Sequence, residues 1–118
     1  MKKREYGDYV QDIVDSIDAV EEFVKRINFE DFRKDKKTSY ATVRSIEIIG
    51  EATKHIPASI RIKYPEIPWK DMAGMRDKTV HEYFGVDLKV VWKAATEELP
   101  RIKPLIKKVL AELEKKTP

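Results

Sequence analysis

Cysteine is absent from the sequence, and only two histidines and four glycines occur among its 118 residues. The absence of cysteine excludes disulfide bonds and thiolate metal ligands. No apolar run approaches the roughly 20 residues that a membrane-spanning helix needs, and the N-terminal stretch MKKREYGDYV lacks the apolar segment of a signal peptide. We therefore expect a cytoplasmic protein without a membrane partner.

A large excess of charge of one sign is missing too. Lysine and arginine number 24 against 21 aspartates and glutamates, so the formal net charge is only +3. Basic clusters at residues 2–4 and 33–37, with Lys103, Lys107 and Lys108, are interpreted as solvated helix surface. The length and the 42% share of hydrophobic residues predict one domain over residues 1–118 with a single core.

Several catalytic signatures are also absent. The sequence has no HExxH motif and no glycine-rich phosphate loop. Its carboxylates are spread along solvated helix faces, as in the acidic row of Asp8, Asp12, Asp15 and Asp18. We therefore expect no metal site and no cofactor.

Hydrophobic residues recur at steps of three and four, the period of amphipathic helices. This spacing predicts a first helix over residues 6–28. Its apolar stripe consists of Val10, Ile13, Val14, Ile17, Val20, Val24 and Ile27. The segment 29–39 is expected to turn the chain, with Asp35, Thr38 or Ser39 available to cap a second helix.

The second predicted helix, residues 40–56, has two faces of low polarity. The richer face consists of Ala41, Ile48, Ile49, Ala52 and Ile56, and the other of Val43, Ile46, Gly50 and Thr53. A helix of this kind packs against neighbours on two sides. It is either the central helix of a bundle or a subunit interface, and the pattern leaves both open.

Prolines 57, 65 and 68 mark a connector with room for one or two helical turns. A third helix is predicted to begin at Pro68 and Trp69 and to stop near Gly85. Asp87 is expected to cap a last element that Pro100 and Pro104 kink or split. With no strand-like alternation, the pattern predicts an all-α fold, an up-and-down bundle of four to five helices.

The segment GMRDKTVHEYFG, residues 74–85, holds an arginine, a histidine and a tyrosine at the spacing Arg76-x4-His81-x-Tyr83. On one ideal helix Tyr83 lies about 20° from Arg76, whereas His81 lies about 140° away. Either the helix loosens near Thr79–Val80 and Gly85, or His81 faces a cleft completed by another element or another chain. The alternative is three ordinary side chains at the edge of the core.

This segment resembles the signature motif of the HepT-like ribonucleases of the HEPN superfamily. The blocks RSIEIIGEATKHIP (44–57), YPEIPWKDMAGMRDKTVHEYFGVDLKVVW (64–92) and ELPRIKP (98–104) also resemble family blocks, in family order. The likeness extends from the first helix to about Val109. It implies an HEPN-like bundle and an RNA endonuclease, the toxin of a toxin–antitoxin pair whose antitoxin is a minimal nucleotidyltransferase.

The resemblance also implies roles for individual residues. Arg76 and His81 would be catalytic, in a composite cleft of a homodimer, and Tyr83 would receive AMP from the nucleotidyltransferase. Asp77 stands where the family often has asparagine; it retains a polar group but brings a negative charge beside Arg76. A catalytically weak or inactive helical adaptor that binds a nucleotidyltransferase or nucleotide is therefore the alternative function, and a purely structural four-helix module is a third.

The residue types themselves suit cleavage of RNA without a metal. Imidazole transfers protons near neutral pH, so His81 would serve as base or acid, and the guanidinium of Arg76 matches phosphate oxygens. Tyr83 would orient the substrate or stack on a base. A single motif histidine cannot act as base and acid in one step, and His55 is interpreted as a bystander. We therefore expect a two-fold dimer with a shared site.

Overall fold

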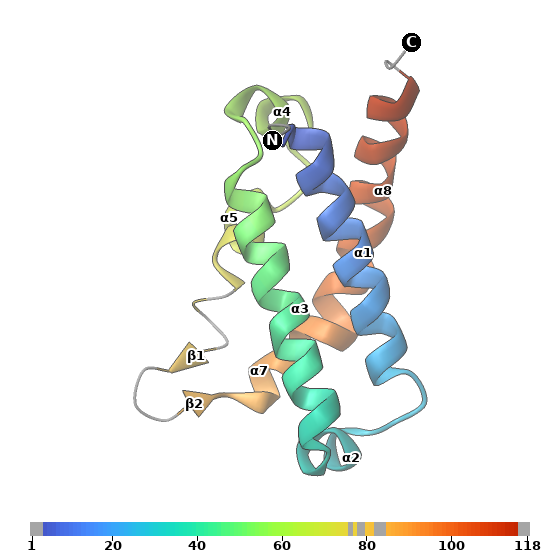
Figure 1. Ribbon diagram of the computed structural model, residues 1–118, viewed down its shortest axis with the longest axis vertical. Coiled ribbons are helices and arrows are strands. Elements are labelled where there is room, and N and C mark those ends of the chain that lie inside the picture. The colour runs from blue at the N-terminus through green and yellow to red at the C-terminus, as the bar shows by residue number, and fades with distance from the viewer. Residues whose placement is uncertain (1–3, 76, 78–79, 82–84, 116–118) are drawn as a thin grey trace.

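The computed structural model describes residues 4–115 except residues 76, 78–79 and 82–84; of residues 80–81 and 85–86 it describes the backbone alone. Figure 1 shows a helical bundle with a small two-stranded extension. In chain order the elements are α1 (Tyr6–Val24), α2 (Phe29–Lys34), α3 (Lys36–Lys54), α4 (Ala58–Lys63), α5 (Trp69–Ala73), β1 (Val80–His81), β2 (Gly85–Val86), α7 (Leu88–Lys93), the π-helical η1 (Ala94–Glu98) and α8 (Leu99–Lys115). The all-α prediction is confirmed.

The helix α1 begins in a capping box, in which Glu5 caps the first turn and the side chain of Asp8 accepts a hydrogen bond from the backbone N–H of Glu5. It ends at Val24, four residues earlier than predicted, because Lys25 is extended and Arg26 has a left-handed φ of 63°. The expected length to residue 28 is therefore wrong.

A short helix occupies part of the segment that was expected to be a turn. The amide oxygen of Asn28 accepts a hydrogen bond from the backbone N–H of Asp31 and starts α2. Phe32 of α2 is completely buried. Asp35 ends α2 and caps α3, accepting hydrogen bonds from the backbone N–H and the hydroxyl of Thr38.

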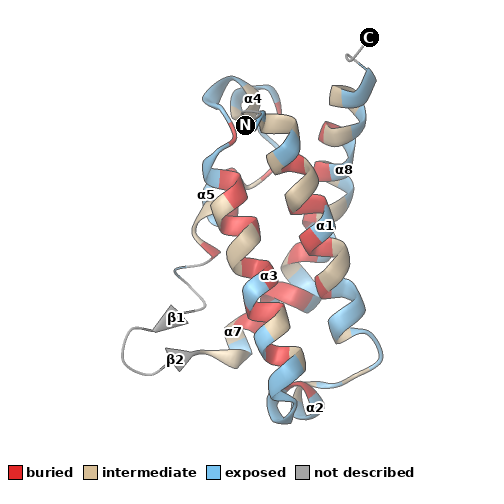
Figure 2. Cartoon of the chain, viewed as in Figure 1, coloured by how far each residue is buried: buried red, intermediate tan, exposed pale blue. Residues whose placement is uncertain are grey.

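The long helix α3 is the centre of the bundle. It contacts α1, α2, α5 and α7, and residues of both predicted low-polarity faces are buried within the chain, including Ile46, Ile49 and Thr53. Figure 2 shows this burial in the middle turns of α1 and α3. The central-helix interpretation is thus confirmed; Ala41 and Ile48 remain only half-buried.

Buried hydroxyl groups on α3 find their partners within the helix. Thr42, Ser45 and Thr53 donate to the carbonyl oxygens of the residues four positions earlier, at 2.8, 3.0 and 2.7 Å. Such bonds remove the cost of burying a hydroxyl. These three residues can therefore lie on the packed side of α3, because each hydroxyl is hydrogen-bonded within the helix.

The C-terminal helical segment is irregular, as its prolines predict, but the irregular turn lies before Pro100 and not at either proline. α7 passes through the π-helical η1 directly into α8, and η1 ends two residues before Pro100. Pro100 has no N–H for the carbonyl four residues earlier and crowds it, so a widened turn at this point is expected. Pro104 lies inside α8 without interrupting it.

The core lies between α1, α3 and α8, and the shorter helices close its ends. Its completely buried members include Val10, Ile13, Ile46, Ile49, Met72, Val91, Ile106 and Val109. Among the described residues, no helix is both long enough and apolar enough to cross a membrane.

Candidate active site and its surroundings

The motif segment begins where α5 is fixed to the bundle. α5 packs on α3, and Trp69 and Met72 are buried. The indole N–H of Trp69 donates to the carbonyl oxygen of Tyr64 at 3.0 Å. Gly74 ends α5, and Met75, directly before the motif arginine, is buried again. The chain therefore enters the motif from a firmly packed position.

The segment ends at an equally defined point. The carboxylate of Asp87 caps α7, accepting hydrogen bonds from the backbone N–H groups of Lys89 at 3.0 Å and Val90 at 3.4 Å. Val91 of α7 is completely buried, and α7 contacts α3. Both ends of the motif segment are thus attached to helices that pack on α3.

Between these two ends the backbone forms an antiparallel strand pair. Val80 pairs with Val86 and His81 pairs with Gly85. Figure 1 shows the pair extending from the bundle beside α3 and α7. The prediction of one helix from Pro68 to Gly85 is therefore wrong, and the strands at Val80 and Gly85 agree with the alternative that the helix loosens near these positions. The β-branched Val80 and Val86 favour extended backbone, and Gly74 is a poor residue for a helix interior.

The candidate catalytic residues fall mostly outside what the structure describes. Arg76 and Tyr83 lie outside the described residues, and His81 is described by its backbone alone. The side chain of Asp77 is exposed. Because His81 belongs to β1, the separation of about 140° that an ideal helix would impose between Arg76 and His81 does not apply.

A second cluster of functional groups lies between α1 and α3, and the sequence did not predict it. The ring of His55 stacks on Tyr9 with centroids 4.4 Å apart and an interplanar angle of 11°. The guanidinium of Arg4 lies 4.6 Å from the centroid of Tyr9 and pairs with Asp12 at 2.8 Å. His55 is therefore part of a stacked arrangement rather than an isolated surface residue.

These groups border a pocket of about 180 Å³. Its lining consists of Arg4, Tyr9, Asp12, Arg44, Ile48, Glu51, Ala52 and His55. Tyr9 and His55 are far apart in sequence, and only the pairing of α1 with α3 brings them together. No local pattern in the sequence could have indicated this pocket.

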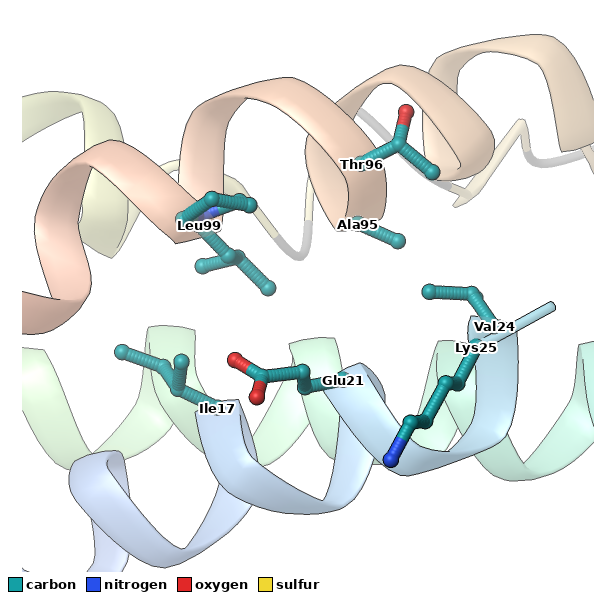
Figure 3. Close-up of a pocket in the computed structure, with 8 residues that line it drawn as sticks. Ile17, Glu21, Val24, Lys25, Ala95, Thr96 and Leu99 are labelled. Carbon is teal, nitrogen blue, oxygen red and sulfur yellow. The ribbon is translucent and has the colours of Figure 1, made fainter.

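A larger, mostly apolar groove of about 320 Å³ lies between α1 and the η1–α8 junction. Figure 3 shows Ile17, Val24 and Leu99 facing the space between the two helices. Near Glu21, which lines the groove, Lys103 pairs with Glu21 at 2.8 Å and Asp18 at 3.2 Å. The hydrogen bond to Glu21, followed by that to Asp18, raises the pKa of Lys103 above its ordinary value. This network connects α1 to α8 beside the groove.

Charged side chains line a pocket next to the motif segment. A third pocket of about 270 Å³ lies next to Met75 and contains the side chains of Asp71, Glu98 and Arg101. Among the described residues, no group of three histidine, aspartate or glutamate side chains could hold a metal ion.

Comparison with known proteins identifies the class to which this helical bundle belongs. Residues 13–109 match the family model described as Ribonuclease HepT-like. The chain therefore belongs to the HepT-like ribonuclease family, whose members are nucleases that hydrolyse phosphodiester bonds.

Individual relatives agree with this assignment. The chain is 50% identical over 107 residues to a Thermococcus cleftensis protein named "Probable ribonuclease HepT", covering 91% of this chain and 97% of that protein. It is 46% identical over 116 residues to a Methanocaldococcus jannaschii protein named "Putative RNase", covering 98% and 100%. A Caldanaerobacter subterraneus protein named "Putative RNase" is 45% identical over 102 residues, covering 86% and 91%. No solved structure matches the chain significantly.

Proposed function

We propose that this protein is an RNA endonuclease that works without a metal ion, with Arg76 and His81 as its catalytic residues. Membership of a ribonuclease family supports the reaction class. The observation that carries the assignment to residues is that the family match spans the whole motif segment. The extended backbone at His81, between helices that both pack on α3, is in keeping with it. This geometry removes the helical constraint that would hold Arg76 and His81 on different faces.

The proposed reaction uses the 2′-hydroxyl of the substrate as nucleophile. Its oxygen attacks the adjacent phosphorus while the bond to the 5′-oxygen breaks, leaving a 2′,3′-cyclic phosphate and a 5′-hydroxyl. One imidazole takes the 2′-hydroxyl proton and another donates a proton to the departing oxygen. The guanidinium of Arg76 stabilises the phosphoryl oxygens, and Tyr83 positions the RNA by hydrogen bonding or stacking. DNA lacks the nucleophile and is not cleaved.

The need for two imidazoles supports a homodimer. Each chain has two histidines, and His55 is stacked on Tyr9 at the far end of α3. A second copy of His81 is therefore the natural source of the second proton-transfer group. In this proposal the two motif segments share one composite cleft.

The proposal includes regulation by a partner protein. The cognate partner is a minimal nucleotidyltransferase that acts as antitoxin and attaches AMP to Tyr83. The phosphodiester linkage adds negative charge and bulk two residues from His81, where the RNA phosphate would bind, and so silences the site. Mass spectrometry of the protein co-expressed with such a partner tests this: an inactive product with an unmodified Tyr83 contradicts it.

The alternative is a helical adaptor that binds a nucleotidyltransferase or nucleotide and has little or no activity. It is favoured by the exposed carboxylate of Asp77, directly after Arg76, which would compete with an RNA phosphate for the guanidinium. Asp77→Asn distinguishes the two functions: a nuclease restrained by this charge gains cleavage activity, whereas an adaptor gains none.

The decisive measurement is cleavage of a labelled RNA oligonucleotide by the purified protein in the presence of EDTA. Wild-type protein should cleave RNA but not the same oligonucleotide with 2′-deoxy sugars. Arg76→Ala and His81→Ala should each lose about two orders of magnitude in rate or more, whereas Lys108→Ala, an exposed cation on α8, should not. Cleavage that EDTA abolishes, or that survives in both motif variants, contradicts the proposal.

A further inference from the structure

The third pocket lies directly beside the start of the motif segment, between α5 and the junction of η1 with α8. Its volume is about 270 Å³. Its lining consists of Pro68, Asp71, Met75, Glu98, Arg101 and Ile102. Met75 is covalently bonded to Arg76, and neighbouring Cα atoms are about 3.8 Å apart. A group bound in this pocket would therefore belong to a nucleotide close to the scissile phosphate.

The apolar part of the lining suits a flat ring. Met75 and Ile102 are buried, at 3% and 4% exposure, and Pro68 is half-buried. An aromatic ring makes favourable contacts with a thioether and with aliphatic side chains. An apolar cavity of about 150 Å³ holds benzene, so this larger pocket has room for the two fused rings of a purine base.

The charged part of the lining has hydrogen-bonding capacity to offer. Among the residues that the structure describes, the side chains of Asp71, Glu98 and Arg101 have no hydrogen bond and no ion pair. Glu98 is nevertheless half-buried, and partial burial of a carboxylate costs free energy that a hydrogen-bond donor on a ligand would recover.

The signs of these charges select a base and disfavour a phosphate group. Two carboxylates outnumber one guanidinium, so the pocket is net negative and repels an anion. A carboxylate only accepts hydrogen bonds and a guanidinium only donates them. Guanine has two neighbouring donor groups, N1–H and the 2-amino group, and two neighbouring acceptors, O6 and N7. None of the other three RNA bases has two neighbouring donor groups, so guanine fits this lining best.

We propose that this pocket is a guanine-binding subsite of the nuclease, in which the carboxylate of Glu98 accepts hydrogen bonds from N1–H and the 2-amino group while the guanidinium of Arg101 donates to O6 and N7. The exposed carboxylate of Asp71 keeps the pocket negative and excludes phosphate. Glu98 is the last residue of the π-helical η1, and π-helical turns occur frequently at functional sites. The proposal rests on the proposed function, since it gives the RNA substrate a base preference beside the cleavage point.

Binding of RNA that cannot be cleaved tests the subsite separately from catalysis. The probes are short fluorescent 2′-O-methyl uridine oligonucleotides with guanine, hypoxanthine, 7-deazaguanine, adenine, cytosine or uracil at the central position, and fluorescence anisotropy measures their affinity. The guanine probe should bind about tenfold more tightly than the uracil probe. Hypoxanthine lacks the 2-amino group and 7-deazaguanine lacks N7, so each should lose about fivefold or more relative to guanine.

Two variants connect these differences to individual side chains. Glu98→Gln should remove the difference between guanine and hypoxanthine, and Arg101→Ala should remove the difference between guanine and 7-deazaguanine. Glu97→Gln is the matched control, because Glu97 is exposed and does not line the pocket, and it should retain both differences. A merely structural effect of a substitution would weaken all probes equally. Circular dichroism checks that each variant is folded.

Cleavage of a pool of RNA sequences gives the second readout, and its outcomes separate the subsite from the proposed reaction. Sequencing of the products should show guanine enriched at one fixed position relative to the cut, and Glu98→Gln should reduce this enrichment by about tenfold or more. Equal affinity for all probes, or preference for another base, overturns the subsite. Cleavage without a base preference overturns it while the nuclease assignment stands. Guanine-selective binding by a protein that cleaves no RNA supports the subsite and contradicts the proposed reaction.

Discussion

The helical bundle and the motif segment of this protein differ in how their structures are determined. In the bundle, α1 and α3 bury mainly apolar residues against each other, and α1 also packs against α8. The motif segment is fixed at Met75 and Asp87 and has between them a strand pair of two residues on each side. The conformation of the bundle is determined by the burial of side chains along its helices. The conformation of the motif segment is determined mainly by the attachment of its two ends.

This difference assigns different tasks to the two regions. Burial of apolar side chains supplies most of the free energy of folding, so substitutions in the bundle should change stability. A segment attached at its ends can carry polar and charged residues that the core would exclude. Substitutions there should change catalysis while the bundle remains folded.

The largest effect is expected for His81→Ala. Loss of a proton-transfer group should reduce the rate of RNA cleavage by about two to four orders of magnitude. Because His81 is not among the buried residues of the described core, of which the motif segment contributes only Met75, the denaturant midpoint should stay close to that of the wild type. Cleavage kinetics and chemical denaturation of the same preparation measure both quantities. A variant that is inactive because it is unfolded would contradict the division of tasks.

The reverse result is expected for Ile46→Ala on α3. Ile46 is completely buried, and removal of its side chain should lower the free energy of unfolding by about 2–5 kcal/mol. Ile62→Ala on α4 is the matched control, since Ile62 is 78% exposed, and its effect should stay within about 0.5 kcal/mol. Equal losses in the two variants, measured by urea denaturation, would mean that burial does not determine stability here.

The sequence predicted the bundle well because its signals are periodic and local. The stripe from Val10 to Val20 on α1 is visible without knowledge of the partner helices and occurs as predicted. Asp35, one of three predicted caps, caps α3, which begins at Lys36 rather than at the predicted residue 40. The predictions that failed in the bundle concern the ends of α1 and α3 and the short helix α2. The left-handed conformation of Arg26 and the short helix around Phe32 have no strong local signal.

The motif segment was harder to predict for a physical reason. A helix from Trp69 to Gly85 satisfies the spacing of the apolar residues, but it ignores the extended preference of Val80 and Val86, which pair across the hairpin. The choice between helix and strand depends on how α5 and α7 are both held against α3. The roles of Arg76, His81 and Tyr83 came from the family resemblance, and the spacing alone did not provide them.

A smaller effect is expected where the connector meets the end of α3. Arg61 donates from Nε to the carbonyl oxygen of Ile56 at 3.1 Å and from its terminal nitrogen to that of Thr53 at 2.8 Å, and so connects α4 to carbonyl groups at the C-terminal end of α3. Arg61→Ala should lower the free energy of unfolding by about 1–2 kcal/mol. Arg61→Lys keeps the positive charge near the helix terminus but not the forked geometry, and should recover only part of the loss. Full recovery would show that charge alone is responsible.

The smallest effect is expected for Tyr64→Phe, and it depends on pH. The buried hydroxyl of Tyr64 donates to the carboxylate of Glu112 on α8, and this bond, followed by burial, raises the pKa of Tyr64 above its ordinary value near 10. In the range above pH 10 the unfolded chain therefore loses a proton that the folded chain keeps, so this contribution to stability is complete below pH 10 and decreases as the pH rises further. Wild type should exceed Tyr64→Phe by about 1 kcal/mol at pH 8, and urea denaturation should show this difference shrinking between pH 10 and 11. A difference that stays constant over that range would mean that the hydroxyl has no favourable bond to lose.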